Sequence, residues 1–242
     1  MQPLVEISLL ARSRSVRRLS WPTSAVAAAM AFACLEAAGA AVLVSYPFNN
    51  NADGSSGFAY TTFDSSVLTS SVVAQGAGLG VYSVGTDSWS GSTQVLKTGP
   101  GTAVAGATAA DAVSNNWYFQ FTLTPTASMD IRSIEADWSR GGTTAVRGWF
   151  VRSSLDSYAS DLYSNQTPIG TATGLQHVGF NITGFTGLAS AVTFRFYIYT
   201  DSTGRYMDFQ NVQFNSHALA VPGGAGAAVL ATALMGLRRR RR

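Results

Sequence analysis

The stretch Ala191–Tyr199, AVTFRFYIY, decides the fold class. Its apolar residues occupy the even-numbered positions Val192, Phe194, Phe196 and Ile198. Its polar or amphipathic residues occupy the odd-numbered positions Thr193, Arg195, Tyr197 and Tyr199. Alternation with a period of two is typical of a β-strand that buries one face and turns the other outward. The stretch therefore predicts a strand with an aromatic, aliphatic inner face.

The same alternation recurs along residues 42–217. In WYFQFTL, the residues Trp117, Phe119, Phe121 and Leu123 are predicted to point inward. Further strands are expected at residues 42–46, 58–63, 79–83, 94–97, 134–138, 146–151, 177–182 and 207–214. About ten short strands separated by Gly, Ser, Asn and Asp predict an all-β domain, an antiparallel β-sandwich or jelly roll.

Two places break the alternation. In residues 207–214 Met207 and Phe209 have one parity, whereas Val212 and Phe214 have the other, so a β-bulge is expected near Gln210-Asn211. Between residues 150 and 164, FVRSSLDSYASDLYS predicts a strand that runs into a short helical or irregular connection.

Charge is distributed unevenly along the chain. Nine of the sixteen basic residues lie in residues 12–18 and 238–242, and residues 42–237 hold seven bases and eleven acids, a net charge of −4. A domain that binds nucleic acid normally carries a basic patch on its own surface. Nucleic-acid binding is therefore excluded as a function of the body.

The N-terminal segment has the order of a secretory signal peptide. Basic RSRSVRR is followed by the uncharged WPTSAVAAAMAFACL and then by AAGAA, which predicts a signal helix within residues 1–41. The small side chains of Ala38 and Ala40 form the expected cleavage signal, with cleavage near Ala40 or Ala41. The alternative is a buried, alanine-rich helix of the domain. Because the one cysteine, Cys34, lies in this segment, an exported chain would hold neither a disulfide nor a cysteine nucleophile.

The C-terminal segment ends in a run of arginines. Residues 219–237 are uncharged, a length at the short end of a membrane-spanning helix. The positive-inside rule would keep the arginines in the cytoplasm and the body outside. The alternative, a nuclear address or nucleic-acid arm, conflicts with the predicted signal peptide.

This tail, residues 218–242, resembles the PEP-CTERM sorting signal of bacterial envelope proteins. The resemblance rests on a small-residue turn, an apolar helix and an arginine cluster: Val221, Pro222, Gly223, Gly224, then Arg238, Arg239, Arg240, Arg241 and Arg242. Gly223-Gly224 stand where the family has Glu-Pro, which also makes the tail similar to the GlyGly-CTERM signal. The resemblance implies transient anchoring in the inner membrane and a sorting protease as partner, of the exosortase or the rhomboid type.

A second resemblance covers residues 116–214. The succession WYFQFTLTP, IRSIEADWSRGG, GWFVRSSLDSY, VTFRFYIY and MDFQNVQF is similar to the β-sandwich ectodomain found repeatedly in PEP-CTERM proteins. The closing strand of that family has an aspartate followed directly by an asparagine, whereas in this chain two residues separate Asp208 from Asn211. That family has no established activity, so the resemblance implies a fold and a destination but no reaction.

No catalytic, metal or cofactor site is predicted. His177 and His217 are isolated, without metal-ligand spacing. Glu135 and Asp137 fall on one outward strand face, and a solvated face is a simpler interpretation than a glycosidase pair. Asp156 and Asp161 could ligate calcium together with nearby backbone carbonyls, but no D-x-D-x-D-G loop is present.

Outward aromatic side chains offer one binding hypothesis. Arg195, Tyr197 and Tyr199 could form a carbohydrate-binding face, with the rings stacking on sugars. We therefore expect a non-enzymatic, secreted or surface-sorted protein of the bacterial envelope or extracellular matrix, with a structural or adhesive role. The alternative is a carbohydrate-binding module that recognises exopolysaccharide.

Overall fold

The computed structural model describes residues 41–49, 58–66, 68–88, 90–91, 94–140, 146–167 and 174–219. The predicted signal peptide with its cleavage site, and the sorting motif from Val221 to Arg242, lie outside the described residues. Within the described part, no helix has the length and apolar character needed to cross a membrane.

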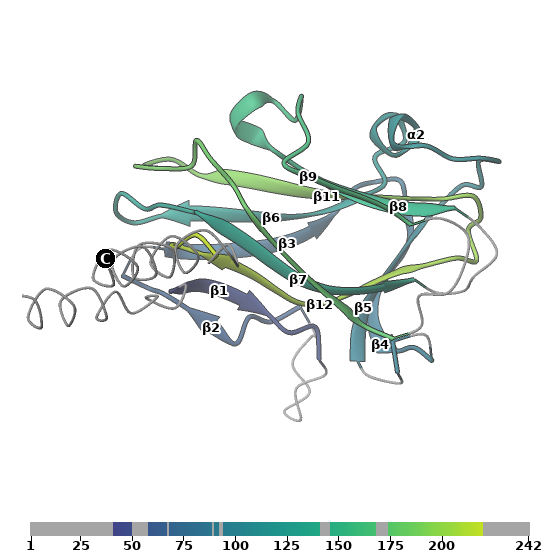
Figure 1. Cartoon of the computed structure of the whole chain (residues 1–242), viewed down its shortest axis with the longest axis horizontal. Coiled ribbons are helices and arrows are strands. Elements are labelled where there is room, and N and C mark those ends of the chain that lie inside the picture. Colours follow the sequence, from purple (N-terminus) through teal and green to yellow (C-terminus); the bar gives the residue numbers. More distant parts are fainter. Residues whose placement is uncertain are drawn as a thin grey trace, which may run out of the picture. The chain divides into compact units, whose positions relative to one another are not determined.

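Two antiparallel sheets form the two layers seen in Figure 1. Sheet A has the order β10-β7-β12-β1-β2, with β5 also paired to β12 and β4 paired to β5. Its strands are β1 (Val42–Tyr46), β2 (Thr62–Phe63), β4 (Leu79–Thr86), β5 (Gln94–Pro100), β7 (Ser133–Arg140), β10 (Gln176–Asn181) and β12 (Met207–Asn215). Sheet B has the order β3-β6-β11-β8-β9. Its strands are β3 (Leu68–Gln75), β6 (Tyr118–Pro125), β8 (Arg147–Ser153), β9 (Tyr163–Thr167) and β11 (Val192–Thr200).

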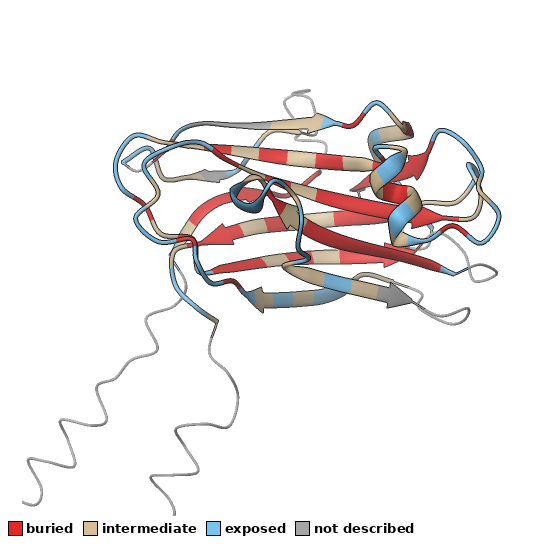
Figure 2. Cartoon of the chain, turned by 90° about the horizontal axis from the view of Figure 1, so that it is seen from above, coloured by how far each residue is buried: buried red, intermediate tan, exposed pale blue. Residues whose placement is uncertain are grey.

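The core between the sheets is built from the predicted inward faces. Buried and partly exposed residues alternate along the strands in Figure 2. Phe119 of β6 stacks on Phe196 of β11 with ring centroids 5.1 Å apart, and Phe209 of β12 approaches Phe119 to 4.9 Å from the opposite sheet. Each fully buried phenylalanine contributes about 1.5–3 kcal/mol of transfer free energy. The aromatic residues therefore hold the two layers together, and the predicted β-sandwich is confirmed.

The bulge predicted in the last strand is also confirmed. The register between β12 and β7 shifts between Gln210 and Gln213, and Asn211 has a left-handed φ of 49°. Asparagine is one of the few residues that adopt this conformation readily. Because the bulge adds one residue, the apolar side chains before it and those after it all point into the core. The four that are buried there are Met207, Phe209, Val212 and Phe214.

Three elements were not predicted. Strands β3 and β9 form the edges of sheet B, and the helix α2 (Ala109–Ser114) begins with a capping box between Thr108 and Asp111. The expected strand at residues 58–63 shrinks to the two residues of β2. The helical connection after β8 is confirmed as the 3₁₀ turn η1 (Ser154–Asp156).

Candidate functional site

Polar side chains gather on the outer face of sheet A, away from the core. Neighbouring strands β10, β7 and β12 bring them together, because the register places His177 opposite Asp137, and Gln210 opposite Asp137 from the other side. We call this group the carboxylate strip and define it by five residues: Glu135, Asp137, His177, Asn211 and Asn215.

His177 lies between the two carboxylates. Its Nδ1 is 2.9 Å from Asp137 Oδ1, and its Nε2 is 3.3 Å from Glu135 Oε2. Only an imidazolium donates from both ring nitrogens, so the protonated ring matches both carboxylates. The histidine side chain is 61% exposed, while those of Glu135 and Asp137 are 21% and 23% exposed. The strip is therefore open to solvent but internally bonded.

Two asparagines of β12 hold the other carboxylate oxygens. Asn211 Nδ2 donates to Asp137 Oδ2 at 2.7 Å, and Asn215 Nδ2 donates to Glu135 Oε1 at 2.8 Å. Asn211 is the left-handed residue of the bulge, so the irregularity that keeps the core in register also orients this amide. Bulges commonly redirect a side chain in this way.

Each of the four carboxylate oxygens thus has one protein partner and keeps further acceptor capacity. Fixed, partly exposed acceptors suit ligands that present several hydroxyl donors, and their negative charge disfavours anions. Glu135 and Asp137 lie on the outward strand face that the alternation predicts, where both are partly exposed. Alternation does not predict His177 as their partner, because His177 lies on another strand, 40 residues from Asp137 in the sequence.

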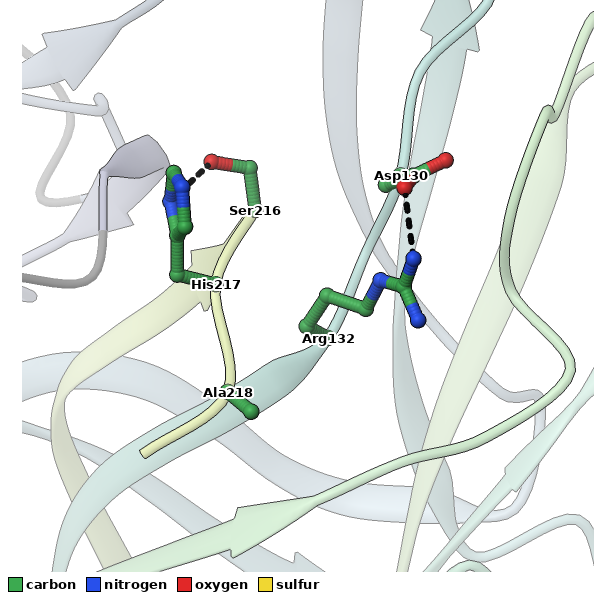
Figure 3. Close-up of a pocket in the computed structure, with 5 residues that line it drawn as sticks. All are labelled: Asp130, Arg132, Ser216, His217 and Ala218. Atoms are coloured by element: carbon green, nitrogen blue, oxygen red, sulfur yellow. Dashed lines mark hydrogen bonds and ion pairs between the residues drawn. The ribbon is translucent and has the colours of Figure 1, made fainter. Parts of the chain in front are cut away.

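A shallow hollow of about 370 Å³ adjoins the strip where β12 ends (Figure 3). It is lined by Asp130, Arg132, Ser216, His217 and Ala218. Ser133 connects the two regions: its hydroxyl donates to the His217 carbonyl at 2.9 Å and accepts from Asn215 Nδ2 at 3.3 Å.

The charged groups of the hollow already have partners. Asp130 accepts from the Gly187 amide at 2.8 Å and from Arg132 Nη2 at 2.9 Å, and these bonds lower the pKa of the Asp130 carboxyl. His217 Nδ1 lies 3.1 Å from Ser216 Oγ. The hollow lies where residues 216–219 leave the sheet after β12. We place no binding site there.

The carbohydrate-binding residues predicted from sequence need a correction. Arg195 lies half-buried on the outer face of sheet B, as expected, but Tyr197 and Tyr199 are only 2% and 5% exposed and offer no ring for stacking. Tyr197 stacks on Phe150, its partner on β8, at 4.9 Å. Tyr199 lies opposite Gly148, where a Cβ atom would come within 2.2 Å of its hydroxyl, so the missing side chain lets the ring fold over the backbone. Helix α2 adds cover, since it lies on the outer side of sheet B and contacts β11 and β8 (Figure 1).

The two aspartates considered for calcium have protein partners. Asp156 accepts from the Ala159 and Ser160 amides, and Asp161 pairs with Arg152 at 2.6 Å. Across the described ranges, no three His, Cys, Asp or Glu side chains are grouped as a metal site would require.

No protein-family model and no curated protein matches the chain. Among solved structures, it is similar to the K3 cleaved adhesin domain of Lys-gingipain from Porphyromonas gingivalis, with 8% identity over 63% of this chain and 95% of that chain, and a TM-score of 0.37. It is also similar to TmCBM61 in complex with β-1,4-galactotriose, with 9% identity over 63% of this chain and 92% of that chain, and a TM-score of 0.33. A family 30 carbohydrate-binding module matches with 15% identity over 67% of this chain and 90% of that chain, at a TM-score of 0.30. Likenesses this distant assign no function to the chain.

Proposed function

We propose that this chain is a non-enzymatic adhesive protein of the bacterial envelope that binds neutral polysaccharide through the carboxylate strip. The observation that carries the proposal is the arrangement of Glu135 and Asp137: Asn211 and Asn215 each donate to one carboxylate oxygen, and the two ring nitrogens of His177 lie 2.9 and 3.3 Å from the other two. Preorganised acceptors bind a ligand with less loss of side-chain entropy than mobile ones. Sugar hydroxyls supply the matching donors in pairs.

The proposal includes export and sorting. The chain is made with a signal peptide, crosses the inner membrane, and is retained by its C-terminal tail until an exosortase or rhomboid-type protease releases it to the surface. Intact mass of the protein from the host's envelope and medium tests this part. Loss of about 40 N-terminal residues and of the arginine tail is expected, whereas recovery of the full chain from cytosol would contradict it.

Binding is tested by titrating the purified chain with neutral polysaccharides, a soluble β-glucan and a soluble galactan among them. The double variant Glu135→Gln with Asp137→Asn should bind at least about tenfold more weakly, because charged acceptors are roughly twice as strong as neutral ones. Asp64→Asn is a control for the loss of a single carboxylate charge, since it lies beyond β2, away from the strip, where Asp64 accepts from the Ser66 amide.

The double variant must retain the wild-type unfolding transition for the comparison to hold. Equal affinity of wild type and double variant would remove the strip from the binding site. Absence of binding to every polysaccharide would leave a purely structural envelope role, the other candidate from sequence analysis.

A further inference from the structure

Arg195 forms a second arrangement on the opposite side of the sandwich, on the outer face of sheet B. Its guanidinium carbon lies 4.2 Å from the ring centroid of Tyr118 and 3.8 Å from that of Tyr158. Cation–π contacts of this kind attract a guanidinium to the faces of the rings. The guanidinium of Arg195 thus lies over two half-buried rings.

The donors of Arg195 are only partly used. Nε donates to Gln120 Oε1 at 3.2 Å and Nη1 donates to the Tyr197 hydroxyl at 3.4 Å. In the part of the chain that the structure describes, Nη2 has no acceptor and no carboxylate lies within 4 Å of Arg195. Arg152, the residue paired with Arg195 on β8, does have a carboxylate partner: its Nε lies 2.6 Å from Asp161 Oδ1.

The backbone that carries Tyr158 is strained. Ser157 and Tyr158 are consecutive left-handed residues, with φ of 58° and 63°. A bulky residue in this region is uncommon, and such strain persists where the surroundings impose it, often at ligand sites. Here the strained turn places the Tyr158 ring over the Arg195 guanidinium.

Neutral polar side chains border the arginine. Gln120 lies opposite Arg195 on β6, and two pairs further along the ladder, on the same face, the hydroxyls of Thr122 and Thr193 lie 3.0 Å apart. All three are partly exposed. Amide and hydroxyl groups of this kind can both donate to and accept from sugar hydroxyls.

We propose that this face binds the carboxylate of an acidic polysaccharide, a uronate, with Arg195 as the anion-binding residue. The Nη1–Nη2 edge of the guanidinium donates to the two carboxylate oxygens, a geometry for which arginine is suited and lysine is not. Gln120, Thr122 and Thr193 bond the ring hydroxyls of the same or the next sugar. The site is separate from the carboxylate strip and has the opposite charge preference.

The test is a titration of the full chain with sodium polygalacturonate, with neutral dextran and poly-L-glutamate as reference polymers. Polygalacturonate should bind, and its affinity should fall as salt is raised. Arg195→Gln should weaken binding at least about tenfold, and Arg195→Lys should weaken it several-fold because the planar fork is lost. Tyr158→Asn removes the ring while keeping a residue that tolerates the left-handed conformation, and it should also weaken binding.

Arg132→Gln is the charge-matched control, since it removes an exposed arginine that lines the hollow at the end of β12 and should leave the affinity within twofold. Glu135→Gln with Asp137→Asn should likewise not weaken uronate binding, so this site and the proposed neutral-polysaccharide site can fail independently. Unchanged affinity in a folded Arg195→Gln variant would overturn the assignment. Equally tight, Arg195-dependent binding of poly-L-glutamate would overturn the polysaccharide as its ligand.

Discussion

Asn211 donates a hydrogen bond of 2.7 Å to Asp137 across the bulge in β12, from a left-handed backbone with φ of 49°. One residue therefore serves both the register of the strand and the orientation of the carboxylate strip. The two roles can be separated by choosing substitutions that tolerate or resist the left-handed conformation.

Asn211→Gly should keep the bulge, and Asn211→Ala should lower the free energy of unfolding by about 1 kcal/mol because a Cβ atom is strained in this conformation. Both lose the donor to Asp137, so both should bind neutral polysaccharide roughly tenfold more weakly, the worth of a hydrogen bond to a charged group. Urea denaturation and polysaccharide titration measure the two effects separately. Loss of affinity in the alanine variant alone would show that the backbone, not the amide, matters.

His177→Ala should lower polysaccharide affinity about tenfold with little change in stability. The side chain is 61% exposed, and exposed substitutions usually change stability by less than about 0.5 kcal/mol. Without the imidazole, Glu135 and Asp137 lose a shared donor and repel each other. His217→Ala, the other histidine, is the control and should leave affinity unchanged. An equal loss in both variants would contradict the role given to His177.

Phe196→Ala should cost about 3–5 kcal/mol of unfolding free energy, because it opens a cavity among rings from both sheets. Phe196 contacts Phe119, Trp149 and Phe209 at centroid distances of 5.1, 5.9 and 6.2 Å. Leu155→Ala in η1, where the side chain is 51% exposed, should change stability by less than about 0.5 kcal/mol. Similar midpoints for the two variants in urea denaturation would mean that Phe196 does not lie in the core.

Alternation along single strands was enough to predict the inner faces of both sheets and the bulge at Asn211, since both depend on local parity. The edge strands β3 and β9 were missed because LTSSVVAQ and YSNQT lack a regular apolar alternation. Strand β9 is the clearer case, with polar residues over most of its length.

The alternation of residues along single strands was not enough to predict which side chains are available for binding. It placed Tyr199 on the outer face, but its burial depends on Gly148 across the strand pair, and the environment of His177 depends on the pairing of β10 with β7. Both are contacts between strands far apart in sequence, which a single sequence does not specify. The contacts of Tyr118 and Tyr158 with Arg195 are not predicted by alternation for the same reason.

The buried carboxyl of Asp208 makes the stability of the fold depend on pH between about 4 and about 7. It has no solvent exposure and its Oδ2 accepts from Ser139 Oγ at 3.1 Å. Burial, followed by the carboxylate of Asp87, raises the pKa of Asp208 to about 7. In the unfolded chain an aspartate titrates near about 3.9, so between these values the folded state binds more protons than the unfolded state.

Stability should therefore fall as pH rises from about 4 to about 7 and level off above, by at most about 4 kcal/mol from this group. Below about 4 the opposite trend sets in, since carboxyls such as Asp130 have a lowered pKa in the folded state. Asp208→Asn should flatten the decline between pH 4 and 7 and be the more stable chain at pH 8. Urea denaturation of both chains at pH 4.5, 6 and 8 measures this. A constant difference in unfolding free energy across the three pH values would show that Asp208 does not titrate in this window.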